Sequence, residues 1–162
     1  MISQMKTFLF LSCLSSLLLS SSAEHSRNDC RDGWFDASFL ELGCLLFNST
    51  ASYSWEEANV YCQRSEQARL VEISSSAQLD FVQMELGLLG GDYWWTSGTD
   101  LGREDSYAWM GSLNLVGEFI WYQNEPSGGY DHNCLCLTRG LGYFGADCEC
   151  GYKTQVICQQ MN

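Results

Sequence analysis

The stretch WYQNEPSGGYDHNCLCLTRGLGYFGADCECGYKTQVIC, residues 121–158, holds the features that decide the fold. It contains the only proline of the chain and five of its nine cysteines. Four of these form two Cys-x-Cys pairs, Cys134 with Cys136 and Cys148 with Cys150, separated by a glycine-rich segment. Two extended segments joined by such a turn are typical of a β-hairpin.

The spacing of the cysteines predicts how this hairpin is cross-linked. Side chains at i and i+2 of a strand point to the same face, so each pair presents both sulfurs on one face. An antiparallel hairpin that turns near Gly142 places Cys134 opposite Cys150 and Cys136 opposite Cys148. Two stacked disulfides across the strands are the expected result.

The first 23 residues have the organisation of a secretory signal peptide. Lys6 provides a basic start, an apolar run covers residues 7–19, and small residues precede Glu24 at the expected cleavage point. The run is too short to span a bilayer, and a packed N-terminal helix is the less favoured alternative. We therefore predict a signal peptide at 1–23 and one secreted, extracellular domain at 24–162.

The number of cysteines also indicates an oxidising, extracellular compartment. Eight cysteines remain when Cys13 leaves with the signal peptide, and an even number in an exported chain favours disulfides. A zinc site is the alternative, but Cys-x-Cys pairs lack the spacing that structural zinc ligands usually show.

The charge of the chain excludes some partners. Without Lys6, seven basic residues stand against 20 acidic ones, a net charge of −13. Such a surface repels nucleic acid and anionic lipid, and no basic stripe offsets it. An acidic surface is compatible with cation binding, although solubility explains it equally well.

A short hairpin is expected at the start of the domain, because cysteine, aromatic and aliphatic residues alternate there around two glycines. Cys30 and Cys44 would close it. Trp34, Phe35 and Phe47 are expected to supply its buried area. Asn48 follows in an Asn-Ser-Thr sequon, which predicts N-glycosylation if its side chain is exposed.

Two helices follow, the first of which begins at a capping box. Ser54 and Glu57 have the spacing at which each side chain bonds the other's backbone amide. The face predicted to be buried comprises residues at helical spacing: Trp55, Ala58, Tyr61 and Cys62.

The second helix follows a brief strand predicted at 70–73. Ser75 and Gln78 form its cap pair, and Gly90 with Gly91 ends it. Its apolar stripe, interpreted as core, comprises Leu79, Val82, Met84 and Leu86.

After the second helix the periodicity is lost. Residues 93–100 predict a strand, and 153–158 predict a final one. The irregular segment at residues 101–121 is long for a compact domain, and an ordered segment of this kind usually carries a binding site.

Together these features resemble the C-type lectin-like domain, in its long form with an extra N-terminal disulfide, over residues 30–158. The resemblance implies an α+β fold in which two helices pack on small antiparallel sheets with a long irregular loop, stapled by disulfides. The matching marks are GCLLF at 43–47, WEEANVYC at 55–62, WWTSGTD at 94–100, Trp121 before Glu125-Pro126, Asn133-Cys134, Asp147-x-x-Cys150, and VIC at 156–158.

The resemblance also implies a disulfide pattern. It pairs Cys30 with Cys44, Cys62 with Cys158, and Cys134 with Cys150. Cys136 and Cys148 are then left to each other, which is the pairing that the hairpin register predicts.

Sugar binding through one calcium ion is the activity that the resemblance implies. Calcium takes six to eight oxygens, and two sugar hydroxyls complete a shell begun by carboxylates and amides. The family's ligands come from a Glu-Pro-Asn or Gln-Pro-Asp motif, an acid before the next cysteine, and a Trp-Asn-Asp motif. These positions are occupied here by Glu125-Pro126-Ser127, His132, and Gly145-Ala146-Asp147.

When the family's motif is carried over residue by residue, only Glu125 and Asp147 provide strong oxygen ligands. The primary calcium site is therefore degenerate. Ser127 offers a hydroxyl as a further ligand, while His132 offers a nitrogen that a hard cation does not favour. Asp131, or Glu149 two residues beyond Asp147, is a neighbouring carboxylate that could substitute. The sugar-binding candidates are therefore Glu125, Ser127, Asp131 and Asp147.

Three further expectations follow from the resemblance. Asp100 and Glu104 lie where many members have an accessory calcium site, although an ordinary acidic turn is an equal alternative. The Glu125-Pro126 bond is expected to be cis. Tyr122 and Tyr130 could stack on a sugar ring or pack as core residues.

The first function expected is therefore that of a secreted, carbohydrate-binding, innate-immune lectin. Glu125 favours mannose-type glycans on microbial surfaces, with calcium as an uncertain cofactor. The alternative is a calcium-independent module that binds protein, lipid or another surface, and an ice-binding or mineral-associated role also fits. An enzyme is not expected, because His25 and His132 have no nucleophile signature beside them.

Overall fold

We describe a computed structural model of the protein, which covers residues 30–160. The predicted signal peptide at 1–23 and His25 lie outside the described residues. The elements are β1 (Phe35–Asp36), β2 (Cys44–Tyr53), α1 (Trp55–Glu66), β3 (Ala68–Leu70), α2 (Ser76–Leu89), β4 (Tyr93–Thr99), β5 (Ala108–Trp109), β6 (Cys134–Thr138), β7 (Phe144–Cys148) and β8 (Thr154–Gln160), with short 3-10 turns at Ser38–Leu40, Glu118–Ile120, Gly129–Asp131 and Arg139–Leu141.

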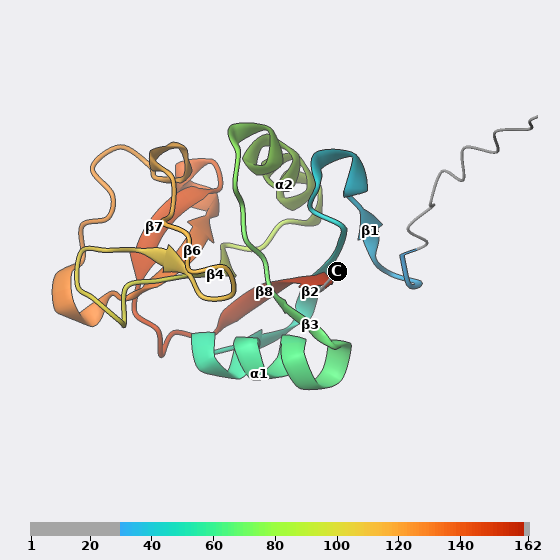
Figure 1. The fold of residues 1–162 in the computed structure, drawn as a ribbon, viewed down its shortest axis with the longest axis horizontal. Helices are drawn as coiled ribbons and strands as arrows, with labels where there is room; N and C mark the ends of the chain where they lie inside the picture. Colours follow the sequence, from blue (N-terminus) through green and yellow to red (C-terminus); the bar gives the residue numbers. More distant parts are fainter. Residues whose placement is uncertain (1–29, 161–162) are drawn as a thin grey trace, which may run out of the picture.

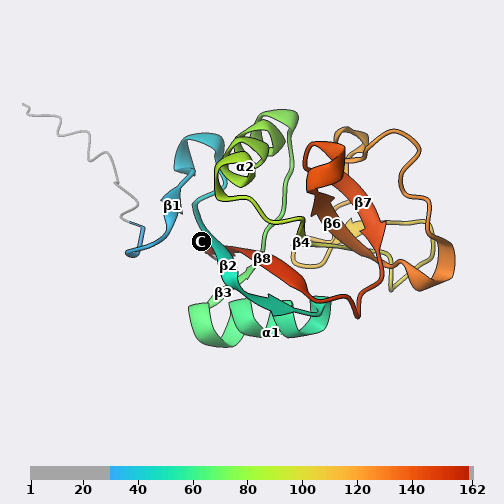
Figure 2. The same cartoon turned by 180° about the vertical axis from the view of Figure 1, so that it is seen from behind.

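The strands form one sheet in the order β1-β2-β8-β4-β6-β7, to which β3 is attached along β8 and β5 along β4. Within the described residues the strand pairs are antiparallel except β4 with β8. Figures 1 and 2 show α1 and α2 on opposite sides of the β2 and β8 strands, with the β6–β7 hairpin at the end away from β1. The predicted α+β class is confirmed.

Alternation along β4 divides the core into two parts. Successive strand residues point to opposite faces, so Trp94 packs in the cluster beside α2 and Trp95 in the cluster beside α1. The Trp94 indole donates to the Gly90 carbonyl at 3.0 Å, and the Trp95 indole donates to the Tyr53 carbonyl at 2.8 Å. Each buried ring thereby keeps its polar atom satisfied.

Both helices begin where the cap residues predicted. The Ser54 side chain accepts from the Glu57 amide, and the Glu57 carboxylate accepts from the Ser54 amide at 2.9 Å. Ser75 caps α2 in the same manner, by accepting from the Gln78 amide. Cys62 lies on the buried face of α1, as expected.

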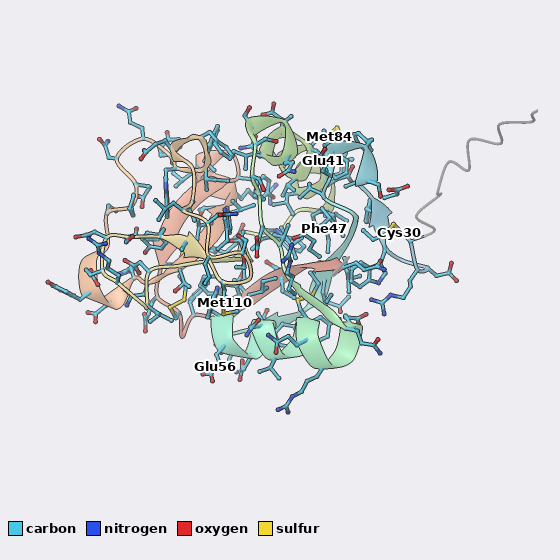
Figure 3. The ribbon with its side chains drawn as sticks, in the orientation of Figure 1. Cys30, Glu41, Phe47, Glu56, Met84 and Met110 are labelled. Carbon is cyan, nitrogen blue, oxygen red and sulfur yellow. A yellow bond between two sulfur atoms is a disulfide. The ribbon has the colours of Figure 1, made fainter. Side chains whose placement is uncertain are left out.

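One residue of the apolar stripe predicted for α2 is not buried. Leu79, Val82 and Leu86 are buried, but Met84 is 55% exposed (Figure 3). Met84 is two residues from both Val82 and Leu86, and residues two apart do not share a helix face. The prediction that Met84 belongs to the core is therefore wrong.

The strand predicted at 70–73 lies two residues earlier, as β3. Only residues 68–70 pair with β8, between Gln160 and Cys158. Val71 still donates to the Ile157 carbonyl at 3.0 Å, and Ile73 is fully buried. Val71 and Ile73 are therefore core residues, although they lie beyond Leu70, the last residue of β3 that pairs with β8.

The N-terminal hairpin forms as predicted, with β1 antiparallel to β2 and Cys30 bonded to Cys44. Phe47 is buried, but Phe35 is 37% exposed, which contradicts the expectation that it is a buried residue. β1 is the edge strand, so Phe35 packs edge-on against Phe47 from outside, with ring centroids 5.2 Å apart.

The four predicted disulfides all form, so the pairing is confirmed. They are Cys30–Cys44, Cys62–Cys158, Cys134–Cys150 and Cys136–Cys148.

The predicted register of the β6–β7 hairpin is wrong by two residues. Cys134 lies opposite Cys148, and Cys136 opposite Ala146. Because the turn is centred on Leu141 rather than Gly142, each disulfide runs diagonally across the strands, with Cα atoms 5.2 Å and 6.0 Å apart.

Candidate functional site

The loop at residues 121–133, here called the long loop, is anchored at its start on β7. Trp121 forms a bridge with Gly145, and the Tyr122 amide donates to the Gly145 carbonyl at 2.9 Å. A Cβ atom at Gly145 would lie 2.7 Å from a methyl of Ile120. Glycine at this position, where the family has tryptophan, therefore permits the loop to lie directly against β7.

The middle of the long loop is held by Asp147. One oxygen of its buried carboxylate accepts from the Ser127 amide at 2.9 Å, and the other accepts from the Gly128 amide at 2.5 Å. The Glu125-Pro126 bond is cis, which confirms the prediction from the resemblance. Asp147 therefore links the loop just after the proline to the strand behind it.

Glu125 lies beside this link. Its Oε1 accepts from the Ser127 hydroxyl at 3.2 Å, while its buried Oε2 has no hydrogen-bond partner among the described residues. Burial raises the pKa of Glu125, and the neighbouring Asp147 carboxylate raises it further. The structure thus brings together Glu125, Ser127 and Asp147.

A second acidic group lies at Asp100. Its Oδ2 accepts from the Asp105 amide at 3.0 Å, and its buried Oδ1 has no partner in the described part of the chain. Burial raises the pKa of Asp100, and the charges of Asp105 and Asp147 add to the rise. Desolvation also raises the pKa of Glu104, with contributions from Asp100 and Asp105.

Tyr107 lies within electrostatic range of both acidic groups. Its hydroxyl donates to the His132 carbonyl, and its ring packs edge-on against Trp121 with centroids 4.8 Å apart. Burial raises the pKa of Tyr107, and the charges of Asp100 and Asp147 raise it further. Tyr107 therefore stays neutral and serves as a hydrogen-bond donor that supports the loop.

The residues at the primary calcium position do not fit a calcium ion. Both oxygens of Asp147 already accept backbone amides, and Ala146 has no side-chain oxygen. The His132 ring nitrogen lies 3.2 Å from the Gly128 carbonyl, within the loop. Glu125 alone would remain as a strong ligand where calcium takes six to eight oxygens.

The remaining sequence-predicted carboxylates do not complete such a site. Asp131 and Glu149 are both exposed, and within residues 30–160 neither side chain forms a hydrogen bond with Glu125 or Asp147. Asp100 and Glu104 lie within electrostatic range of each other, but no third acidic, histidine or cysteine side chain joins them in a metal-binding group within residues 30–160. Within the described residues, Asp100 and Glu104 lie in an acidic turn in which Asp100 Oδ1 has no hydrogen-bond partner.

The two tyrosines considered for sugar stacking are surface residues. Tyr130 is 82% exposed at the tip of the long loop. Tyr122 is also exposed and lies near Phe144, with ring centroids 6.4 Å apart. Both are available to a ligand, so the alternative that they pack in the core is wrong.

Sequence reasoning missed a hollow on the hairpin next to the long loop, here called the hairpin groove. It has a volume of about 600 Å³, and Tyr93 and Tyr152 form an edge-to-face pair in it at 5.3 Å. Tyr93 reaches the site because β4 pairs with β6, which no local pattern reveals. The lining residues are Tyr93, His132, Thr138, Gly140, Leu141, Ala146, Asp147, Cys148, Glu149 and Tyr152.

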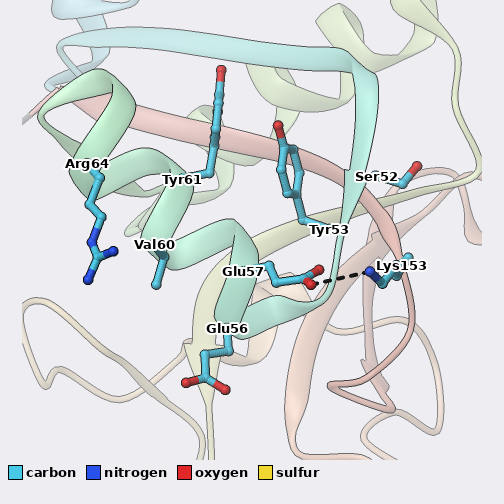
Figure 4. A pocket seen from close by; sticks show the side chains of 8 residues that line it. All are labelled: Ser52, Tyr53, Glu56, Glu57, Val60, Tyr61, Arg64 and Lys153. Carbon is cyan, nitrogen blue, oxygen red and sulfur yellow. Dashed lines mark hydrogen bonds and ion pairs between the residues drawn. The ribbon is translucent and has the colours of Figure 1, made fainter.

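A separate hollow of about 670 Å³ lies between α1 and the end of β2, with Lys153 on its wall (Figure 4). Glu57 and Lys153 form an ion pair at 3.3 Å on its wall. It contains none of the predicted sugar or calcium residues. Neither of the α-helices in residues 30–160 has the length and apolar character of a membrane span.

This fold, with its disulfides and its long loop closed on a cysteine-rich hairpin, defines a lectin-type binding domain. The family model described as "Lectin C-type domain" matches residues 51–160, and the chain belongs to this family of carbohydrate-binding, lectin-like domains.

Two relatives illustrate the range of the family. The chain is 29% identical over 134 residues to human C-type lectin domain family 17, member A, and the match covers 83% of this chain but only 33% of that relative. It is 26% identical over 164 residues to human Lithostathine-1-alpha, and the match covers 96% of each chain.

Solved structures agree on the fold. The carbohydrate-recognition domain of cow CD23, determined in the presence of a GlcNAc2Man3 oligosaccharide, matches with a TM-score of 0.67, 23% identity, and coverage of 82% of this chain and 96% of that one. A Ca2+-dependent type II antifreeze protein in its Ca2+-free form matches with a TM-score of 0.68, 26% identity, and coverage of 82% and 100%.

Proposed function

We propose that the protein is a secreted glycan-binding protein whose long loop and hairpin groove recognise carbohydrate without the family's primary calcium ion. The observation that carries the proposal is the double acceptance of the Ser127 and Gly128 amides by Asp147. These two bonds hold the loop against β7 with protein donors alone. A cation is then not needed to order the binding surface.

The side chains available to a ligand favour neutral sugars. Exposed aromatic rings such as Tyr130 offer faces on which a sugar ring can stack. Glu149 and Tyr152 in the hairpin groove offer carboxylate acceptors and a hydroxyl for sugar hydroxyl groups. The chain's net charge of −12 disfavours sialylated or sulfated glycans.

Neutral mannose-like or glucose-like glycans of microbial surfaces are the ligand class we expect, and innate immune recognition is the corresponding role. Family membership, together with the oligosaccharide with which the cow CD23 domain was solved, supports carbohydrate as the class. Export through the predicted signal peptide at 1–23 would place the protein outside the cell.

A second candidate function has its own support. Leu101, Leu113 and Leu115 are largely exposed on the irregular segment that precedes the long loop. Exposed aliphatic side chains suit a protein or lipid surface better than a sugar. This calcium-independent binding of a non-carbohydrate surface is the alternative to be separated by experiment.

A glycan array tests the proposal when probed in parallel with calcium and with a chelator. We expect binding to neutral glycans of similar strength in both conditions, reduced by Tyr130→Ala. Leu113→Ala is the matched control, since it shortens an equally exposed residue on the neighbouring segment. Loss of all glycan binding in chelator contradicts the proposal, and an absence of binding in both conditions favours the second candidate.

A further inference from the structure

A third hollow lies around the sequon, here called the Asn48 groove. Its volume is about 310 Å³, at the lower end of the range for small-ligand sites. It lies between the first residues of the domain, the outer part of β2 and the end of α1. The lining residues are Asp32, Trp34, Leu46, Phe47, Asn48, Ser49, Thr50, Tyr61 and Glu66.

The side chain of Asn48 is held in one orientation in this groove. Its Oδ1 accepts from the Thr50 amide at 3.0 Å and from the Thr50 hydroxyl at 2.9 Å. Tyr61 lies beside Asn48 in the same groove. Burial raises the pKa of Tyr61, and a hydrogen bond from the Asn48 side chain opposes that rise.

The walls of the Asn48 groove are aromatic. Tyr61 stacks on Tyr53 with ring centroids 4.9 Å apart, which fixes its ring beside β2 (Figure 4). Trp34 is held from the other side by the Arg31 guanidinium, 4.4 Å from the centre of its ring. Both rings therefore have defined positions before any ligand arrives.

The rim of the Asn48 groove is polar. The Tyr61 hydroxyl donates to a Glu66 oxygen at 3.2 Å, and Glu66 also pairs with Arg31 at 3.8 Å. Asp32 adds a second carboxylate at the rim. Aromatic walls with carboxylate and hydroxyl groups at the edge have the chemistry that accommodates a neutral saccharide.

We infer that Asn48 carries an N-linked glycan and that the first sugars of this glycan sit in the Asn48 groove, against Trp34 and Tyr61. In the covalent step, the Asn48 amide nitrogen loses one proton and bonds to the anomeric carbon of an oligosaccharide. The bond from that carbon to a lipid-linked diphosphate breaks, and the diphosphate leaves with the electron pair. One amide N–H remains to donate to Tyr61.

The inference depends on export but not on sugar binding at the hairpin groove. β2 and β7 are separated in the sheet by β8, β4 and β6, so a glycan on β2 leaves the hairpin groove uncovered. It would instead cover the face formed by α1 and the start of the domain. The glycan is thus an added structural layer on that face.

Occupancy of Asn48 is tested by secreting the full chain from cultured animal cells. The intact mass is measured before and after treatment with peptide N-glycosidase. We expect a glycan on the wild type and on Ser49→Ala, which keeps the sequon, and none on Thr50→Ala, which retains Asn48 but breaks the sequon. An Asn48 without glycan in the secreted wild type overturns the inference.

Seating in the groove is tested by the rate at which the glycosidase releases the glycan. We expect release from the folded wild type to be roughly tenfold slower than from folded Trp34→Ala, the factor that a contact of about 1.4 kcal/mol produces. Equal rates in the two proteins overturn the seating. Tyr61→Phe keeps the ring, and is expected to show an intermediate rate.

One measurement requires no substitution, in case Trp34→Ala fails to fold. With a ¹³C-labelled glycan on the wild-type protein, we expect magnetisation transfer between the first sugar and the Trp34 indole. A labelled glycan with no contact to Trp34 or Tyr61 contradicts the inference. These readouts leave the proposed function untouched, because they involve neither the long loop nor an added ligand.

Discussion

The Asp147 carboxylate accepts from the Ser127 amide at 2.9 Å, so strand β7 holds the long loop one residue after its cis proline. In a calcium-dependent lectin site the acidic residue at this position would point its oxygens at the ion. Here both oxygens are turned to backbone amides. Asp147 is therefore a structural residue of the loop in addition to a candidate ligand contact.

Replacing Asp147 by alanine is expected to loosen the loop without unfolding the domain. Two charge-assisted bonds are lost, and the free energy of unfolding should fall by about 1–3 kcal/mol. Urea denaturation measures this loss, and amide hydrogen exchange at Ser127 and Gly128 should accelerate. Glu149→Ala, two residues away and exposed, is the control that should change neither quantity.

Glu125 predicts a pH dependence of stability. Its pKa in the folded state is raised above the reference of 4.5, so above that pH the folded protein retains a proton that the unfolded chain has released. Stability from this group is therefore lost as the pH rises through the folded-state pKa. Glu125→Gln should gain stability over the wild type between acid and neutral pH, as measured by urea denaturation. If the difference in unfolding free energy between Glu125→Gln and the wild type does not vary with pH, the raised pKa of Glu125 is refuted.

Gly145 should tolerate no side chain. A Cβ atom there meets Ile120 at 2.7 Å, so Gly145→Ala is expected to cost about 1–3 kcal/mol of unfolding free energy and to shift the start of the long loop. Gly140→Ala, where nothing lies within 4 Å of the added atom, is the matched control. Equal midpoints of thermal unfolding for the two variants would contradict the packing described.

The disulfides should differ strongly in their contribution to the free energy of unfolding. Removing Cys62–Cys158, which spans 96 residues, is expected to cost roughly 4–5 kcal/mol on the chain-entropy account. Cys136–Cys148 spans 12 residues inside a segment that Cys134–Cys150 already closes. Its removal should cost less than about 3 kcal/mol, the value for an isolated loop of similar length. Paired cysteine-to-alanine variants compared by urea denaturation test this order.

Much of the scaffold could be predicted because its determinants are local or covalent. Ser54 and Ser75 are cap residues whose partners lie three positions away, and both helices begin there. The hairpin register was wrong although the pairing was right, since moving a strand by two residues keeps every side chain on its face. Cys134 can therefore reach Cys150 either directly or diagonally.

The candidate site was harder to predict because it depends on contacts between distant residues. The sequence identified Glu125 and Asp147 as the retained carboxylates, and the structure brings them together. It gave no indication that Asp147 accepts two loop amides, because this depends on the path of the loop over β7. Tyr93 joined the hairpin groove only through the pairing of β4 with β6.

The most direct test of the central claim is calcium titration by calorimetry on the secreted domain, followed by binding of the same sample to mannan resin with and without chelator. We expect no heat of calcium binding at millimolar concentrations and equal retention on the resin in both conditions. Calcium binding accompanied by loss of retention in chelator would contradict the account.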